Sequence, residues 1–221
     1  MKTKEFVDLE KRLLPNFHGF TIKGKLLFIS PVKNTLRGFY FEPSAFTGKN
    51  FYVNRFFLPL CVPAKRVHFT FGHRIGSEKR WSKDDPTFDT DLTSEMLKEV
   101  PFLTSLKTPK DVARALEPLT KRPNPHCHEA FAYTLIQAGE TRAAAEVLDA
   151  LLKLTDTTVS WQQEIALRAQ LVRNMLLKSP EEAQKQLALW ESETASNLGL
   201  EMFRQSSANF ISEEPWDSMS T

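Results

Sequence analysis

The spacing of apolar and polar residues divides the chain into a strand-rich first part and a helical second part. Apolar side chains recur at three- and four-residue intervals over residues 3–14, which predicts an amphipathic helix that ends at Pro15. Five strand-like runs with short connectors follow without any helical pattern between them, so an antiparallel sheet is expected. These runs are GFTIKG, KLLFIS, RGFYFE, NFYVNRFFLPL and RVHFTFGHRI. The first two meet at Lys23-Gly24, which predicts a hairpin turn.

The last of these runs, residues 66–75, alternates most regularly. Its apolar positions are Val67, Phe69 and Phe71. Its polar positions are His68, Thr70 and Gly72. Strict alternation predicts a strand with one face on the core, covered by the N-terminal helix, and one open face. We expect the open face to carry a candidate binding surface formed by Arg55, His68, Thr70 and Arg74.

Beyond residue 91 the pattern is helical. Helix ends are expected at Gly139 and at capping sequences that begin at Thr108, Ser160 and Ser179. The predicted fold class is α+β, with an N-terminal helix packed on an antiparallel sheet and then an all-α domain of stacked helical hairpins. The predicted units are a sheet domain at 1–80, a polar linker at 81–91, a helical hairpin domain at 92–205 and a flexible tail at 206–221.

The net charge of +2 conceals an uneven distribution. Residues 1–91 hold 16 Lys and Arg against 9 Asp and Glu, a balance of +7, whereas the remaining residues balance at −5. No apolar run approaches the roughly 18 residues that a membrane-spanning helix needs, and the charged N-terminus lacks the apolar core of a signal peptide. The two cysteines, Cys61 and Cys127, do not form a disulfide framework. A cytoplasmic protein without a membrane partner is therefore expected.

The helical half contains a weak internal repeat. Ala144 and Leu148 recur as Ala183 and Leu187, at a distance of 39 positions. The first unit resembles a tetratricopeptide repeat, a resemblance carried by Ala132, Leu135, Gly139, Ala144 and Leu148. The second unit departs from that family, because Lys178 stands where the turn glycine belongs. The resemblance implies stacked antiparallel helix pairs and a role in protein binding.

Two short motifs resemble catalytic or metal sites. Asp89, Asp91 and Thr93 match the D-x-D-x-T motif of the haloacid-dehalogenase phosphatases, whose first Asp is a nucleophile. That chemistry requires a buried parallel strand before the motif, but the preceding SKDDPTF is polar, so a solvated loop that caps the next helix is favoured. The run His126–Glu129 begins a predicted helix and lacks a second cluster to complete a metal site. No catalytic residue, metal ligand or cofactor is expected.

The aromatic and basic residues of the sheet raise the alternative of nucleic-acid binding. Arg37-Gly38-Phe39 begins a partial match to the RNP1 motif of RNA-recognition motifs, but Tyr40, Glu42 and Pro43 depart from it. We interpret this match as coincidental, because that fold also needs helices between its strands. A basic sheet face that holds single-stranded nucleic acid stays an alternative. Against it, 8 of the 17 Phe fall between residues 39 and 71, and a stable sheet must bury most of them.

The N-terminal half resembles a bacterial family of small domains of unknown function. The resemblance is carried by an opening helix that ends near GFTIKG and by the strand FYVNRFFLPL, and it covers roughly residues 1–80. It implies an α+β fold, a bacterial origin and a role as an immunity-type or accessory protein. The principal hypothesis is a non-catalytic protein that binds another protein. The alternatives are a nucleic-acid-binding protein and an enzyme without a recognisable motif.

Overall fold

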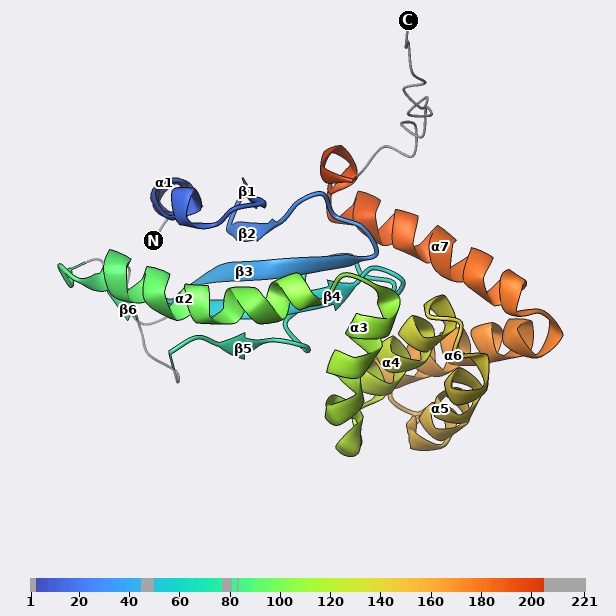
Figure 1. The fold of residues 1–221 in the computed structure, drawn as a ribbon. Helices are drawn as coiled ribbons and strands as arrows, with labels where there is room; N and C mark the ends of the chain where they lie inside the picture. Colours follow the sequence, from blue (N-terminus) through green and yellow to red (C-terminus); the bar gives the residue numbers. More distant parts are fainter. Residues whose placement is uncertain (1–2, 45–49, 77–80, 83, 205–221) are drawn as a thin grey trace, which may run out of the picture.

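The computed structural model describes residues 3–44, 50–76, 81–82 and 84–204. Among these residues the chain first forms α1 (Thr3–Leu13), the 3-10 helix η1 (Leu14–Asn16) and a six-stranded sheet (Figure 1). The strands are β1 (Phe20–Lys23), β2 (Leu26–Ile29), β3 (Thr35–Pro43), β4 (Asn50–Pro59), β5 (His73–Arg74) and β6 (Trp81–Ser82). Neighbouring strands pair antiparallel in the order β1-β2-β3-β4, and the outer edge of β4 pairs with both β5 and β6. The predicted hairpin and antiparallel sheet are confirmed.

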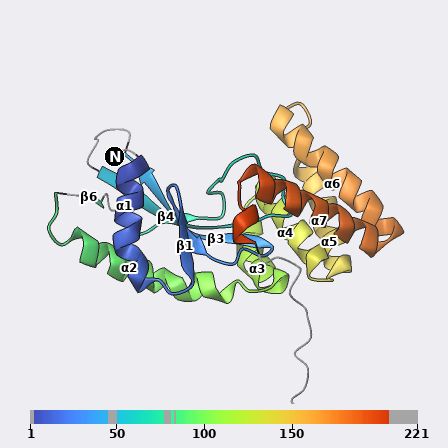
Figure 2. The same cartoon turned by 90° about the horizontal axis from the view of Figure 1, so that it is seen from above.

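The second part of the described chain is helical, so the α+β fold class is confirmed. The helices are α2 (Phe88–Ser105), α3 (Pro109–Leu116), η2 (Glu117–Lys121), α4 (Pro125–Gln137), α5 (Thr141–Leu154), α6 (Ser160–Lys178), α7 (Pro180–Asn197) and η3 (Glu201–Phe203). The sheet with α1 and α2 and the group α3–α7 lie side by side along the molecule (Figure 2). In the described part of the chain, no helix is long and apolar enough to cross a membrane.

One face of the sheet is covered by α1 and α2. The apolar stripe of α1, formed by Phe6, Leu9 and Leu13, is at most 2% exposed, as its spacing predicts. It packs together with apolar residues of α2 on side chains that alternate along β3 and β4. These sheet residues are Phe39, Phe41, Phe51 and Val53.

The opposite face is covered by the end of α7, by η3 and by residues 66–72. Phe28, Leu36 and Phe56 of the sheet are fully buried there together with Ala195 and Leu200. The ammonium group of Lys23 on β1 donates hydrogen bonds to Leu198 O and Gly199 O just beyond α7. A cation at this position satisfies carbonyl groups that the helix end leaves free. Both faces of the sheet therefore belong to the core over most of their length.

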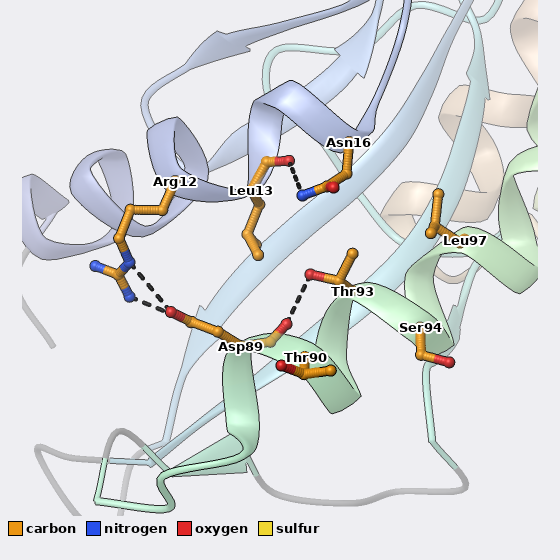
Figure 3. A pocket seen from close by; sticks show the side chains of 8 residues that line it. All are labelled: Arg12, Leu13, Asn16, Asp89, Thr90, Thr93, Ser94 and Leu97. Carbon is orange, nitrogen blue, oxygen red and sulfur yellow. Dashed lines mark hydrogen bonds and ion pairs between the residues drawn. The ribbon is translucent and has the colours of Figure 1, made fainter.

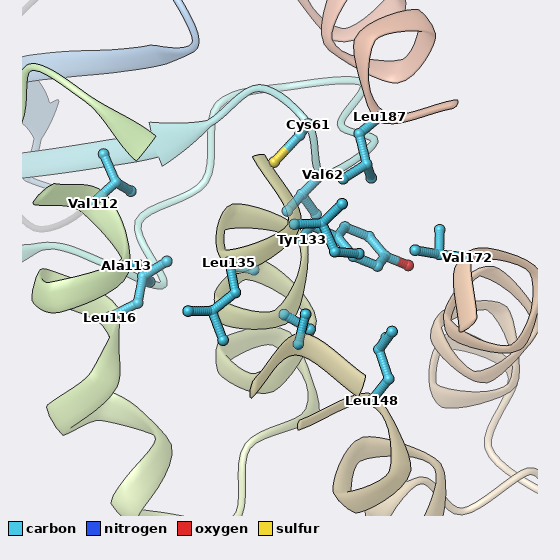
Figure 4. Close-up of a cluster of buried hydrophobic side chains, with 14 of the residues drawn as sticks. Cys61, Val62, Val112, Ala113, Leu116, Tyr133, Leu135, Leu148, Val172 and Leu187 are labelled. Carbon is cyan, nitrogen blue, oxygen red and sulfur yellow. The ribbon is translucent and has the colours of Figure 1, made fainter. Parts of the chain in front are cut away.

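The helical half is organised around α4. This helix contacts α3, α5, α6 and α7, and it is buried on nearly all sides. Figure 4 shows Tyr133 of α4 with Leu148 of α5, Val172 of α6 and Leu187 of α7 around it. Consecutive helices pack as neighbours, which confirms the stacked hairpins. The repeated small and large residues predicted from the sequence lie in this core, where Ala144, Leu148, Ala183 and Leu187 are all 0% exposed.

Three of the four predicted helix ends are confirmed. Thr108 and Asp111 form a reciprocal capping box at α3, and the Ser179 side chain accepts from Glu182 N at the start of α7. Gly139 ends α4 with a φ of 80°, a value that glycine adopts easily. The Ser160 prediction is wrong, because α6 has Val159 at its N-cap position and no side chain caps it.

The prediction of a strand at residues 66–75 is wrong for most of that range. Only His73 and Arg74 pair with β4. The alternating phenylalanines do not share one face: Phe69 packs on Phe56 with ring centroids 5.6 Å apart, whereas Phe71 stacks on Phe57 at 5.7 Å. Because Phe56 and Phe57 point to opposite faces of β4, residues 66–72 wrap around that strand and contact two different cores.

The structure also differs from the predicted polar linker at 81–91. Trp81 pairs with Phe51 of β4 and is 1% exposed, and α2 begins at Phe88. The apolar residues of α2 extend the sheet core as far as Leu103. A single tryptophan and a single phenylalanine inside a polar run therefore anchor it to the sheet. The domain boundaries stay a prediction, and the predicted tail at 206–221 lies outside the described residues.

Thr194 of α7 joins the two halves by hydrogen bonds. Its hydroxyl accepts from Ala64 N and donates to Val62 O, each at 3.2 Å, and its side chain is fully buried. Thr194→Val keeps the shape but leaves both backbone groups unsatisfied, so we expect a loss of about 2 kcal/mol in unfolding free energy, measured by urea denaturation. Ser192→Ala removes an exposed hydroxyl on the same helix and should change stability by less than about 0.5 kcal/mol. Equal effects of both substitutions would contradict the bridging role.

Candidate functional site

A cleft of about 460 Å³ opens between the end of α1 and the first half of α2 (Figure 3). Its lining contains two leucines and six polar residues. They are Arg12, Leu13, Asn16, Asp89, Thr90, Thr93, Ser94 and Leu97. A volume of this size accommodates a small molecule or a few residues of an extended peptide. The cleft is therefore the candidate functional site of the described residues.

Local helix geometry explains why these residues meet. Asp89, Thr93 and Leu97 follow one another at four-residue spacing, so they lie along one side of α2. Leu13 ends α1 and is 2% exposed, because it also belongs to the sheet core. Asn16 ends η1, where its amide Nδ2 donates to Leu13 O at 3.1 Å. The cleft thus has an apolar floor of one core residue, Leu13, and one partly exposed residue, Leu97 at 42% exposure, with a polar rim held by two helical segments.

The charges at the cleft neutralise each other. The Nε and Nη2 atoms of Arg12 each lie 3.2 Å from a carboxylate oxygen of Asp89, and these bonds join α1 to α2 at one end of the cleft (Figure 3). Both side chains are about half exposed, so the ion pair stabilises the fold by about 1 kcal/mol or less. The cleft therefore favours an uncharged ligand over a strongly anionic or cationic one.

Several polar groups at the cleft are open to a ligand. Thr93 Oγ1 donates to Asp89 O at 2.6 Å and is already engaged. The hydroxyls of Thr90 and Ser94 and the Oδ1 atom of Asn16 make no hydrogen bond within the described part of the chain. Two donor hydroxyls and one amide oxygen beside an apolar floor can bind a peptide backbone together with one apolar side chain.

The D-x-D-x-T residues lie in the first two turns of α2. Asp89 is paired with Arg12, and Asp91 accepts from Thr87 Oγ1 at 3.2 Å. The motif therefore does not form the expected loop before the helix, and Thr87, which precedes the motif, occupies the N-cap position of α2. The phosphatase chemistry needs the motif after a parallel strand, whereas the neighbouring strands here are antiparallel. The resemblance to that motif carries no site.

The predicted surface residue Arg55 lies on the α2 side of the sheet. Its guanidinium stacks 3.8 Å from the centre of the Phe102 ring and pairs with Glu99 at 3.1 Å. His73 lies beside it: its Nδ1 atom is 2.6 Å from Arg55 Nη2, and its Nε2 atom is 3.3 Å from Glu99 Oε1. Burial lowers the pKa of Arg55, and the carboxylate of Glu99 opposes that shift. Arg55 is 12% exposed in its side chain, so it joins α2 to the sheet rather than presenting an open charge.

Arg74 points to the other face of the sheet. It lies 3.9 Å above the Tyr52 ring and 3.7 Å from the Glu42 carboxylate, which also accepts from Asn54. The separation from Arg55 follows from the register, in which Arg74 faces Asn54 and His73 faces Arg55. Neighbouring residues of a strand point to opposite faces. The two arginines predicted to share a surface therefore cannot do so.

His68 and Thr70 lie elsewhere again, on residues 66–72 beside the helical half. His68 Nδ1 and Thr70 Oγ1 are 3.1 Å apart, and the His68 ring is 6.5 Å from the ring of His126. The structure thus brings His68 and Thr70 together but separates both from Arg55 and Arg74. The predicted common surface is wrong, because it assumed a single strand across residues 66–75.

The side chains of His126, His128 and Glu129 each contact a different partner. His126 stacks on Trp161 with ring centroids 4.9 Å apart, and His128 Nδ1 lies 3.0 Å from Asn124 O. Glu129 is fully buried and accepts from Arg168 at 2.7 and 3.1 Å. Among the described residues, no three His, Cys, Asp or Glu side chains converge as a metal site would require.

Two ionisable residues outside the cleft, Cys61 and Glu10, are fully buried. Cys61 lies in the apolar run LPLCVP and is 0% exposed, and burial raises the pKa of its thiol. Glu10 was not anticipated: it is 0% exposed, and burial raises its pKa to about 8. Its position four residues after Phe6 places it inside the apolar stripe of α1, which is the signal that could have identified it.

The cleft itself was not predicted. Its lining comes from segments more than 70 residues apart; Asp89 and Thr93 of the D-x-D-x-T match belong to it, but no pattern in either segment indicates that the two segments meet. Comparison of the chain with protein-family models, curated proteins and solved structures found no match in any of the three. The two family resemblances drawn from the sequence therefore stay predictions.

Proposed function

We propose that the protein binds another protein without catalysing a reaction, and that an extended segment of this partner occupies the cleft between α1 and α2. The observation that carries this proposal is the cleft itself, with about 460 Å³ of space above a floor of Leu13 and Leu97. An extended peptide presents backbone donors and acceptors that suit Thr90, Ser94 and Asn16. One apolar side chain of the partner would contact the two leucines.

The proposed setting is a bacterial cytoplasm, in which the protein acts as an immunity-type or accessory protein. The free, buried thiols of Cys61 and Cys127 support a reducing compartment. The bacterial origin and the immunity-type role rest on the resemblance of residues 1–80 to small bacterial domains. Ala144 and Leu148 of the tetratricopeptide-like pattern are buried in the helical core, and the role in protein binding rests on the resemblance to that family.

Nucleic-acid binding at the sheet has weaker support. Helices α1 and α2 cover one face, and the end of α7 covers much of the other. The two arginines that would contact phosphate are engaged, Arg55 with Glu99 and Arg74 with Glu42. A partner strand of nucleic acid would have to displace these ion pairs, and we therefore favour a protein partner.

The proposal is tested by cross-linking from within the cleft. A photo-reactive amino acid at Ser94 should form an adduct with one defined host protein, and the same probe at Arg142, which is exposed on α5, should not. Leu97→Asp should weaken binding of that partner at least about tenfold, because it places a charge in the apolar floor. Leu177→Asp is the matched control, since Leu177 is 64% exposed on α6.

Two outcomes would count against a peptide-binding cleft. One is an adduct pattern at Ser94 that equals the pattern at Arg142. The other is a partner whose affinity falls equally with Leu97→Asp and Leu177→Asp. An adduct to nucleic acid at Arg55 or Arg74, with affinity that falls steeply with salt, would favour the alternative instead.

A further inference from the structure

Three aromatic rings meet where residues 66–72 touch the helical half. His68 lies on this segment, His126 in the first turn of α4 and Trp161 in the first turn of α6. The His68 ring lies 6.5 Å from His126, and His126 stacks on Trp161 with an interplanar angle of 8°. The rings of His68 and Phe71 are also in a T-shaped arrangement, with centroids 5.8 Å apart and an interplanar angle of 67°. We call residues 66–72 the His68 loop.

The charged groups around the two histidines determine which protonation state fits. Burial lowers the pKa of His68, and a charge on His126 would lower it further. Burial also lowers the pKa of His126; Glu129 opposes this shift and Arg168 adds to it. Glu129 and Arg168 neutralise each other through two hydrogen bonds. His126 also stands at the positive end of α4, where an added positive charge is unfavourable.

The stack on Trp161 acts in the other direction, because an aromatic face attracts a cation. This attraction acts on His126 alone, and Trp161 is 43% exposed, so water screens it. It does not relieve the repulsion that two imidazolium groups would exert on each other across the contact. The closed contact therefore favours two neutral histidines.

We propose that His68 and His126 form an acid-sensitive contact, which releases the His68 loop from the helical half when the pH falls below neutrality. Release would uncover Phe69 and Phe71, which cover Phe56 and Phe57 of β4. The chain remains anchored at Val62 and Ala64 by Thr194 and at His73 by pairing with β4, so opening is confined to the loop. This regulatory contact is independent of the proposed peptide cleft.

The direction of the pH effect follows from the lowered pKa values. The contact is stable above the pKa of about 6.5 that histidine has in the open loop, and it weakens as the pH falls through that value. Each histidine that must take up a proton on opening can contribute at most about a tenfold change in the opening equilibrium per pH unit. Two histidines can therefore contribute up to about a hundredfold per pH unit.

The test is hydrogen exchange of the loop amides in the full chain between pH 7 and 5, corrected for the intrinsic pH dependence of exchange. The wild-type protein should lose protection in residues 66–72 steeply below pH 6.5, while α4 and β4 stay protected. His68→Gln and His126→Gln should each reduce the slope by the contribution of one proton. The double variant should show protection that is nearly independent of pH. His18→Gln, at an exposed position on the segment after α1, should leave the wild-type slope unchanged.

The wild-type measurement tests the proposal without any variant. Loop protection that stays constant from pH 7 to 5 would overturn it, and so would a wild-type slope in the double variant. A loss of protection that spreads equally over β4 and α4 would indicate global unfolding and would also overturn the local contact. Failure of the cross-linking experiment at Ser94 leaves these measurements unaffected, so the two proposals can be distinguished.

Discussion

Gly38→Ala is expected to lower the unfolding free energy by at least about 3 kcal/mol. A Cβ atom at residue 38 would lie 2.3 Å from Leu27 O and 2.6 Å from the Cα of Phe28, and both of these neighbours are backbone atoms of β2. Backbone in a central strand cannot move aside without breaking its pairing with β3, so the cost exceeds that of ordinary overpacking. Chemical denaturation followed by far-ultraviolet circular dichroism measures the loss.

Gly24→Ala provides the matched control for this effect. Gly24 lies in the β1–β2 turn with a φ of 64°, and a Cβ atom there would meet no atom within 4 Å. The substitution should cost only about 1 kcal/mol, which is the penalty of left-handed backbone for alanine. Equal losses of stability in the two variants would contradict the steric explanation of the glycine at position 38. The steric demand explains the glycine of the RGFYF run independently of its partial match to the RNP1 motif.

Arg168→Met is expected to lower the unfolding free energy by about 3 kcal/mol. Arg168 holds the carboxylate of Glu129, which is 0% exposed in the middle of the helical half. Without the guanidinium, a buried charge would have no counter-ion, and breaking such a pair typically costs about 3–5 kcal/mol. Because Arg168 itself is 24% exposed, water can partly replace it, so we expect the lower end of that range.

A double-mutant cycle separates the contribution of the Glu129–Arg168 ion pair to stability from that of side-chain packing. Glu129→Gln combined with Arg168→Met removes the charge as well as its partner and should recover at least about 1 kcal/mol relative to Arg168→Met alone. Arg142→Met is the control, since Arg142 is 94% exposed and pairs with Glu146 only four residues away on α5. It should change stability by less than about 0.5 kcal/mol. A control as destabilised as Arg168→Met would exclude the buried pair as the cause.

Patterns within single elements predicted much of the fold. The stripe of Phe6, Leu9 and Leu13 identified α1 and its buried face, and the turn at Gly24 identified the first hairpin. Capping chemistry at Thr108 located the start of α3 to the residue. These features depend on neighbours within about four residues, which is the distance over which sequence patterns carry direct physical information.

The failures have a common physical cause. Residues 66–72 alternate like a strand, but a loop that wraps around β4 also places successive phenylalanines against buried surfaces, here on two separate cores. Trp81 and Phe88 lie in a polar run, and their burial depends on strands contributed by a different segment. Alternating apolar and polar residues indicate which side chains are buried. Burial alone does not distinguish a strand from a segment that lies between two cores.

By itself, the sequence determined the class of the fold, the order of sheet and helices, and some apolar positions of the core such as the stripe of α1, because these follow from short-range periodicity and from the need to bury phenylalanine and leucine. Only the tertiary structure decided which functional groups meet. It separated Arg55 from Arg74, placed His68 beside His126, and formed the cleft from Arg12, Asp89 and their neighbours. Such meetings depend on register and on packing between segments that lie up to about 80 residues apart, and no local pattern encodes either of them.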